Sequence, residues 1–193
     1  QKLCASPSRP PQYVTPHDKL LWFGEKNYDA DYRTDRGYTA SDGTAPCKTK
    51  CPAHIPVQGY IKLASQGRFD EALELIRREN PFPAVCGRVC PRFCEEACTR
   101  GDVDAPVAID EVKKFLAQRE LDPATRVKPK MLNTTGKPYK NQIAVIGAGP
   151  AGLSCAYYLA LQGYPVTVFE KQKTLGGMLT MGIPSFRLEK DVV

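Results

Sequence analysis

The 193-residue sequence has no apolar run long enough to cross a bilayer and no signal-peptide pattern at its start. We therefore expect a cytoplasmic protein without a membrane anchor. It has only two histidines, His17 and His54, and no grouping typical of acid–base or nucleophilic catalysis. Its charge excess is modest, with 27 Lys and Arg against 21 Asp and Glu. The positive residues cluster only between Arg126 and Lys140, where no nucleic-acid-binding motif accompanies them, so we interpret this stretch as a solvated linker.

What the sequence does contain is a glycine-rich turn after an apolar run. Residues 143–146 predict a buried parallel strand, and Gly147, Gly149 and Gly152 follow in the G-x-G-x-x-G spacing. In this motif the first glycine allows a tight turn, the second lets the backbone approach a pyrophosphate, and the third lets a helix pack closely on the sheet. We expect that helix over residues 151–162, with free N–H groups and a positive dipole end toward phosphate.

A second strand, expected over residues 166–169, ends at Glu170, whose carboxylate could accept a hydrogen bond from a ribose 2′-OH. Strand, turn, helix, strand and acid in this order predict a dinucleotide site. Helix packing alone would explain Gly152 but neither Gly149 nor Glu170. The continuation to Gly176 and Gly177 resembles that of flavoproteins with two dinucleotide domains, which favours FAD over NAD. In those proteins the glycine pair lets the main chain pass close to the flavin side.

Six of the eight cysteines fall in one region, at Cys47, Cys51, Cys86, Cys90, Cys94 and Cys98. Helical patterns cover residues 57–66, 69–79 and 109–119. The last pattern predicts that Ile109, Val112, Phe115 and Leu116 are buried. Gly87 and Pro91 disfavour one unbroken helix through the final four cysteines. We therefore expect the cysteines in loops and short turns at the ends of a small helical domain.

Three kinds of chemistry compete for these cysteines. An even count permits disulfides, but a dinucleotide site without a secretory signal indicates a reducing compartment. Structural zinc takes four ligands, usually from C-x-x-C pairs, whereas here the pairs are C-x-x-x-C and six thiols exceed what one zinc needs. A 4Fe–4S cluster takes one thiolate per iron from several loops and fits best. Pro52 and Pro91 each follow a cysteine, as in the C-P endings of bacterial ferredoxins.

The expected fold class is α + α/β, with a small helical iron–sulfur domain followed by the first βαβ unit of a Rossmann-like FAD-binding domain. We expect an extended N-terminal segment over residues 1–41, the helical domain over 42–122, a linker over 123–141 and the nucleotide-binding part over 142–193. Two strands cannot bury both faces of a sheet, so we expect the FAD-binding domain to be truncated here.

The cysteine loops, residues 80–98, the Pro106-Val-Ala-Ile segment and the glycine motif together resemble the glutamate synthase small-subunit family and the N-terminal half of dihydropyrimidine dehydrogenase. This resemblance covers roughly residues 47–193. It implies a helical domain with two 4Fe–4S clusters, FAD in the adjoining domain, and NAD(P)H bound to a further domain that we expect to lie outside this chain. By position, Cys47 and Cys98 match ligands of one cluster. Cys51, Cys90 and Cys94 match ligands of the other.

The resemblance also places the nucleotide site. It implies that Glu170 is the ribose acid, and that Gly177, Met178 and Leu179 lie near the flavin, with Arg187 in a segment close to the cofactor. The candidate cofactor-binding residues are Gly147, Gly149, Pro150, Ala151, Gly152, Glu170, Lys171, Gly176, Gly177, Met178, Leu179 and Arg187.

The chain departs from the family pattern at two places. The family has two further cysteines just upstream of the position of Cys47, but residues 5–46 contain none, and Asp42 occupies about one of those places. The family's second cluster takes a Gln or Glu in the following helix, where this chain has Lys113, which cannot coordinate iron while protonated. Six thiolates cannot fill two four-thiolate sites. We therefore expect one cluster drawn from four of the six cysteines, with a second possible, and the choice of four stays open.

These features predict an electron-transfer module of an FAD-dependent NAD(P)H oxidoreductase. It would pass electrons between nicotinamide, FAD and a cluster to a partner subunit or acceptor in a larger complex, and would be inactive without the missing NAD(P)H site. We expect no catalytic side chain, tuning of the cluster by Arg88 and Arg92, and a local hydrogen-bonding role for His54. The alternatives are a non-catalytic iron–sulfur docking subunit with a vestigial nucleotide fold and a zinc-stabilised NAD-dependent dehydrogenase.

Overall fold

The computed structural model describes residues 45–133 and 136–193, so the expected extended segment 1–41, with His17 in it, lies outside the described residues. The chain divides into two compact units. Of the described residues, the first unit contains 45–58 and 92–109, and the second contains 59–91 and 110–193. The cysteine-rich region is therefore shared between the units, because the chain leaves the first unit after Gln58 and returns to it at Arg92.

The first unit is built from very short helices. Helix α2 (Pro46–Thr49) packs against α6 (Phe93–Glu96), and the 3-10 helix η5 (Thr99–Asp102) follows α6. Proline at the first position of α2 has the φ that a helix start requires and lacks only an N–H that would be unbonded there. The apolar side chains of Ile55 and Val57 are buried beside these turns. Such short helices mainly serve to fix the directions of the side chains they carry.

The helical part of the second unit contains most of the buried apolar residues. It comprises α3 (Val57–Ser65), which starts at the unit boundary, α4 (Phe69–Arg77), α5 (Pro83–Val89) and α7 (Ile109–Gln118). Tyr60, Leu73, Ile76 and Leu116 are almost completely buried. Helix α4 buries Ala72, Leu73 and Ile76, which share one face at helical spacing. The helices expected over 57–66, 69–79 and 109–119 are confirmed, each ending one or two residues earlier.

Helix α7 turns a different face inward from the one expected. Phe115 is half exposed and meets only the edge of the Phe69 ring, with 5.4 Å between ring centroids. Val112 is only partly buried. The buried face instead consists of Ile109, Asp110, Lys113, Leu116 and Ala117. The prediction is confirmed for Ile109 and Leu116 and wrong for Val112 and Phe115. It counted apolar residues alone, whereas Asp110 and Lys113 form an ion pair that allows both charges to be buried.

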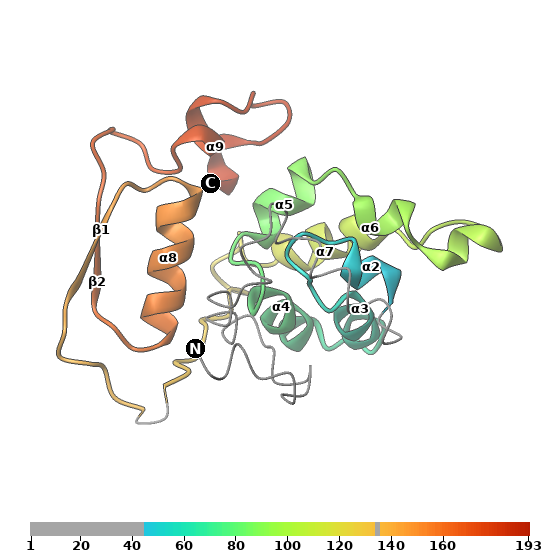
Figure 1. The fold of residues 1–193 in the computed structure, drawn as a ribbon, viewed down its shortest axis with the longest axis horizontal. Helices are drawn as coiled ribbons and strands as arrows, with labels where there is room; N and C mark the ends of the chain where they lie inside the picture. Colours follow the sequence, from blue (N-terminus) through green and yellow to red (C-terminus); the bar gives the residue numbers. More distant parts are fainter. Residues whose placement is uncertain (1–44, 134–135) are drawn as a thin grey trace, which may run out of the picture. The chain divides into compact units, whose positions relative to one another are not determined.

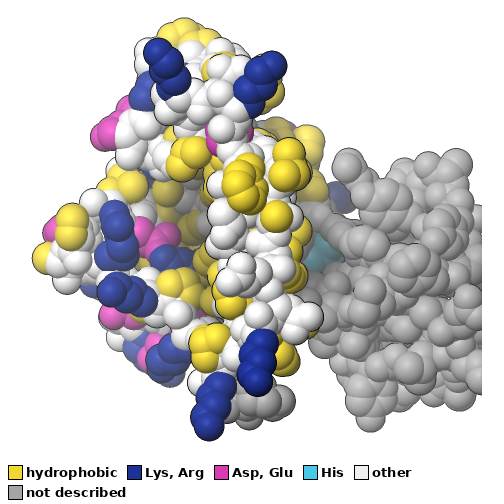
Figure 2. All heavy atoms as spheres, turned by 90° about the vertical axis from the view of Figure 1, so that its left-hand side faces the viewer, with side chains coloured by type: hydrophobic (Ala, Val, Ile, Leu, Met, Phe, Trp, Pro, Cys, Tyr) yellow, Lys and Arg dark blue, Asp and Glu magenta, His cyan; other side chains and the backbone are white. Residues whose placement is uncertain are grey.

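The nucleotide-binding part is a parallel pair of strands covered on one face by a helix. Strands β1 (Ile143–Ile146) and β2 (Val166–Phe169) have the expected bounds, and Val145 pairs with Val168 in the register. Helix α8 (Pro150–Leu161) packs along the pair (Figure 1). Ile146 and Phe169 are exposed on the other face, where Figure 2 shows hydrophobic side chains at the surface. β1 is therefore buried on one face only, not on both as a central parallel strand would be.

The described part of the expected linker packs against the end of α8. Leu132 donates its N–H to the carbonyl of Leu161 (2.7 Å), and Tyr139 donates to the carbonyl of Gly163 (2.8 Å). The Tyr139 ring stacks on that of Tyr164, with centroids 4.5 Å apart. After β2 come the short helix α9 (Met178–Met181) and the 3-10 helix η6 (Lys190–Val192). None of the helices described spans enough apolar residues to traverse a membrane.

Gly87 provides a test of how closely α5 and α7 pack. A Cβ atom at Gly87 would lie 2.9 Å from both the Cα and the Cβ of Lys114. We expect Gly87→Ala to lower the free energy of unfolding by about 1–3 kcal/mol, because the main chain must move to admit the methyl group. Urea denaturation would measure the change.

Gly101→Ala is the matched control, since its Cβ would lie 3.3 Å from the Pro106 ring, a side chain that can shift slightly. We expect a smaller loss there. If Gly87→Ala were as stable as this control, the close contact between α5 and α7 would be disproved.

Candidate functional site

Four of the six clustered cysteines belong to the first unit. Cys47 lies in α2, Cys51 follows that helix, Cys94 lies in α6, and Cys98 directly precedes η5. Burial raises the pKa of the Cys47 thiol, and the neighbouring thiols of Cys98 and Cys51 raise it further. Cys94 is buried and the other three are partly exposed. This unit therefore brings four thiols onto two short helices and the residues that follow them.

Each Cys-Pro pair is followed by a residue with left-handed backbone. His54 has φ 51° and donates its N–H to the carbonyl of Cys51 (2.9 Å), closing a turn after Pro52. Arg92 has φ 66° and begins α6, and its carbonyl accepts a hydrogen bond from the N–H of Glu95 (2.8 Å). A non-glycine residue in this conformation costs free energy, and such residues gather at functional sites. The expected local hydrogen-bonding role of the His54 side chain stays a prediction.

The other two cysteines lie in the second unit, on α5 and at its end. Cys86 lies inside α5, and Cys90 terminates it with its N–H bonded to the carbonyl of Cys86. The Oδ1 atom of Asn80 accepts the N–H of Phe82 (2.9 Å) and lies 3.7 Å from the sulfur of Cys86. Burial raises the pKa of Cys86, and the contact with Asn80 and the charge of Lys113 offset this only in part. The expectation that the cysteines occupy loops therefore needs correction at Cys86, which is helical.

A buried ion pair lies beside these two cysteines. The Nζ atom of Lys113 is 2.5 Å from Oδ1 of Asp110, and the two side chains are only 7% and 2% exposed. Burial alone would lower the pKa of Lys113, but the hydrogen bond and charge of Asp110 outweigh it and raise that pKa, with smaller contributions from Cys90 and Cys86. Lys113 is therefore an ammonium group at neutral pH. Asn80, Asp110 and Lys113 are each buried as whole residues.

The donor set fits a cluster. All seven cysteines within residues 45–133 and 136–193 are free of disulfide bonds. In the same ranges no three His, Cys, Asp or Glu side chains converge closely enough to hold a single metal ion. Within the first unit, Cys47, Cys51, Cys94 and Cys98 lie on short helices and turns, and a 4Fe–4S cube takes its thiolates one per iron from several such segments.

The glycines of this turn differ in the space around them. Gly147 has φ 97° and donates its N–H to the carbonyl of Phe169 (2.7 Å), so the turn closes onto β2. A Cβ atom at Gly152 would overlap the carbonyl oxygen of Gly147, which leaves no room for a side chain. A Cβ atom at Gly149 would meet nothing within 4 Å. Folding therefore requires a glycine at Gly152 but leaves the space over Gly149 open to a ligand.

Glu170 holds this turn in place. Its Oε2 atom accepts the N–H of Ala148 (2.7 Å) and its Oε1 atom accepts the N–H of Gln172 (2.8 Å). Backbone N–H groups, first that of Gln172 and then that of Ala148, lower the pKa of this carboxyl. The acid expected to bind a ribose thus orients the glycine turn, a role that the motif alone does not indicate.

The later glycine pair passes directly against the same turn. Gly176 has φ 98° and donates its N–H to the carbonyl of Ala148 (2.8 Å). A Cβ atom at Gly177 would lie 2.9 Å from the Cα of Gly149. The structure therefore brings the predicted residues Gly147 to Gly152, Glu170, Gly176 and Gly177 together. Of the other candidates, Pro150, Ala151, Lys171, Met178 and Arg187 are exposed, and Leu179 is partly buried.

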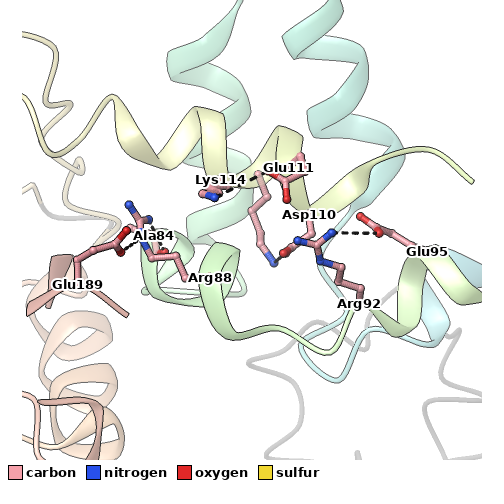
Figure 3. A network of polar contacts seen from close by, with 9 residues as sticks. Ala84, Arg88, Arg92, Glu95, Asp110, Glu111, Lys114 and Glu189 are labelled. Carbon is pink, nitrogen blue, oxygen red and sulfur yellow. Dashed lines mark hydrogen bonds and ion pairs between the residues drawn. The ribbon is translucent and has the colours of Figure 1, made fainter. Parts of the chain in front are cut away.

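A long-range ion pair connects α5 with the segment beyond the glycine pair. The Nε atom of Arg88 donates to Oε2 of Glu189 at 2.5 Å, and its Nη1 atom donates to the carbonyl of Ala84 at 3.0 Å (Figure 3). The Arg88 side chain is only 7% exposed. Leu188 is fully buried, and Lys190 donates to the carbonyls of Ile183 and Thr180. Sequence reasoning missed this pair because 101 positions separate its members.

Comparison with known proteins identifies the family. Residues 26–124 match the family described as dihydropyrimidine dehydrogenase domain II, 4Fe-4S cluster, and residues 145–187 match the NAD(P)-binding Rossmann-like domain. The first match covers half of the chain, so the chain belongs to that family. The resemblance seen in the cysteine loops and the glycine motif is confirmed.

Three curated relatives are similar to most of this chain. The beta subunit of a Geobacter sulfurreducens NADPH-Fe(3+) oxidoreductase is 45% identical over 77% of this chain and 23% of its own length. The beta subunit of an NADP(+)-dependent formate dehydrogenase from Moorella thermoacetica is 42% identical over 78% and 24%. The Escherichia coli glutamate synthase (NADPH) small chain is 41% identical over 79% and 32%. The chain thus spans about a quarter to a third of the length of these relatives.

Substituting the two glycines should separate folding from binding. We expect Gly152→Ala to lower the unfolding temperature by several degrees, because its methyl group would overlap the carbonyl of Gly147. Gly149→Ala should leave that temperature nearly unchanged and lower dinucleotide affinity at least about tenfold, since its methyl group occupies the open space. Calorimetry and the amount of co-purified nucleotide would measure the two effects. Equal loss of stability in both variants would contradict this division.

The pH dependence of the glycine turn follows from the lowered pKa of Glu170. The carboxylate is ionised at neutral pH and accepts the N–H of Ala148 there. The hydrogen bond should weaken only as the pH falls through a value below the ordinary 4.5, because the folded state favours the ionised form. The amide resonance of Ala148, followed by NMR, should titrate over that range and stop titrating in Glu170→Gln. An Ala148 amide that is insensitive to acid in the unsubstituted protein would disprove the contact.

Proposed function

We propose that this member of the dihydropyrimidine dehydrogenase domain II family is the electron-transfer module of an FAD-dependent NAD(P)H oxidoreductase. The observation that supports the proposal most is the joint presence of six unbridged thiols and a glycine turn completed by an acid and a second glycine pair. A zinc-stabilised dehydrogenase would need only four thiols for its metal. It would also not need Gly176 and Gly177 to pass close to the glycine turn.

FAD is the cofactor that this site fits. Gly149 leaves the space over the start of α8 open, and the helix N-terminus there favours a pyrophosphate. Glu170 stands at the end of β2 with its carboxylate already oriented by two backbone N–H groups. Gly176 and Gly177 bring the main chain against Gly149 with room for no side chain on Gly177. These residues would bind and orient the dinucleotide, while Met178, Leu179 and Arg187 follow on the side proposed to face the flavin.

The cysteines would hold the cluster. The candidate ligands are Cys47, Cys51, Cys86, Cys90, Cys94 and Cys98, of which one 4Fe–4S cube needs four. Burial raises the pKa of Cys47 and Cys86, so these thiols are protonated without a metal and must release protons when they bind iron. When bound, the flavin and the cluster together convert the electron pair of a hydride into single electrons. The chain's own residues bind, orient and electrostatically tune these groups.

The electron donor and acceptor lie beyond this chain. We propose NAD(P)H as the donor, bound at a site outside it, because the two-stranded sheet offers a single glycine turn for a dinucleotide. The acceptor would be a partner subunit or a substrate domain, consistent with relatives that are named as subunits. No side chain of this chain needs to act as an acid, base or nucleophile in this scheme.

Anaerobic purification of the full-length protein tests the proposal. We expect about four irons and four sulfides per cluster, together with a flavin absorbance band. Cys90→Ser should lower the iron content, because it removes a thiol next to the buried ion pair, whereas Cys155→Ser should not, because that cysteine is exposed on α8. Zinc without iron, or iron with no flavin, would refute this function and favour one of the two alternatives.

A further inference from the structure

Buried polar residues of the described structure gather around one end of helix α5. Asn80 contacts Cys86, and the charges of Lys113 and Asp110 act on the pKa of Cys86. Gly87 closely approaches the main chain of Lys114. Because Gly87 follows Cys86 in the sequence and Lys114 follows Lys113, this contact brings α7 at Lys113 close to α5 at Cys86. Helix α7 therefore places the Lys113 ammonium against the segment that carries Cys86 and Cys90.

Lys113 differs from the other cations near the cysteines. The guanidinium of Arg88 is as buried as Lys113 and is paired with Glu189, but the cation that partly offsets the raised pKa of Cys86 is Lys113. Arg92 is 44% exposed, with Glu95 at 4.0 Å, so solvent and salt screen its charge. The Lys113 side chain is 7% exposed, and its field acts through protein rather than water.

We propose that Lys113, held in position by Asp110, is a fixed positive charge that sets the reduction potential of the cluster bound at the Cys86–Cys90 end of α5. The inference rests on the proposed function, with Cys90 as a ligand. A cube with four thiolates carries net negative charge, and one-electron reduction adds one more negative charge. A nearby buried cation stabilises the reduced state more than the oxidised state, and a nearby anion does the reverse. Lys113 therefore raises the potential, while Asp110 fixes the ammonium and limits that rise.

The opposite signs of the two charges give the test. Lys113→Met alone would leave the Asp110 carboxylate buried without its cation, so the design compares Asp110→Asn with the double variant Asp110→Asn/Lys113→Met. Each full-length protein is purified anaerobically, its iron is counted, and the cluster is titrated with dithionite while its visible and EPR spectra are recorded. We expect Asp110→Asn to raise the midpoint potential and the double variant to lie below Asp110→Asn. Each step should change the ratio of reduced to oxidised cluster about tenfold, or about 59 mV for one electron.

Lys114→Met is the matched control. Lys114 neighbours Lys113 on α7, but its side chain is 35% exposed and lies 4.0 Å from Glu111. Its removal should leave the potential nearly unchanged. Thermal unfolding of the iron-free proteins shows whether each variant still folds.

The outcomes separate the inference from the function on which it rests. Shifts of opposite sign with full iron content support the tuning role. Shifts of the same sign, no shift, or loss of iron from both variants would overturn it, since the pair would then serve only folding or cluster retention. An unsubstituted protein without iron or flavin would refute the proposed function itself.

Discussion

The burial of the Lys113–Asp110 ion pair is the constraint around which the cysteine-bearing part of the second unit is arranged. Removing two charges from water costs several kcal/mol per ion, and an apolar pair of similar volume is often as stable or more so. Such a pair is therefore weak evidence for stability, and its position near Cys86, a thiol whose pKa burial raises, makes this region a candidate functional site. Gly87 makes the arrangement possible, because only a glycine allows α5 to approach the main chain of α7 so closely.

The glycine turn of the same unit also depends on glycines that lie too close to main-chain atoms to carry a side chain. Gly152 lies against the carbonyl of Gly147, and Gly177 lies against Gly149, so two separate chain segments converge where side chains are excluded. Glu170 then uses both carboxylate oxygens to fix the backbone N–H groups around the turn. The space over Gly149 stays open beside the start of α8, and a helix start favours a ligand recognised through its phosphates.

Local patterns predicted much of this structure, and long-range contacts account for what they missed. The bounds of β1 and β2 followed from two apolar runs, and the helices over 57–65 and 69–77 followed from apolar spacing. The burial predicted for Val112 and Phe115 on α7 was wrong, because a sequence pattern treats Lys113 and Asp110 as exposed polar residues and does not show that they neutralise each other. The prediction that β1 is a buried strand was wrong for its outer face, because the burial of a strand depends on neighbouring strands and not on its own composition. Cys86 was expected in a loop, since Gly87 suggested a break where it instead permits helix packing.

The segment from Gly176 to Glu189 unites the two halves of the candidate site in a way that no motif indicates. It begins against the glycine turn, through the hydrogen bond from Gly176 to Ala148, and it ends on α5, through the ion pair of Glu189 with Arg88. Lys190 and the buried Leu188 fix its middle and end to the surrounding chain. Arg88 lies midway between Cys86 and Cys90 in the sequence, and the expectation that its charge helps to tune a cluster stays a prediction. Its ion pair with Glu189 gives it a further role, because it connects α5 with this segment. Arg88 and Lys113 are equally buried, so neither sequence proximity to a cysteine nor burial alone decides which cation a cluster would sense.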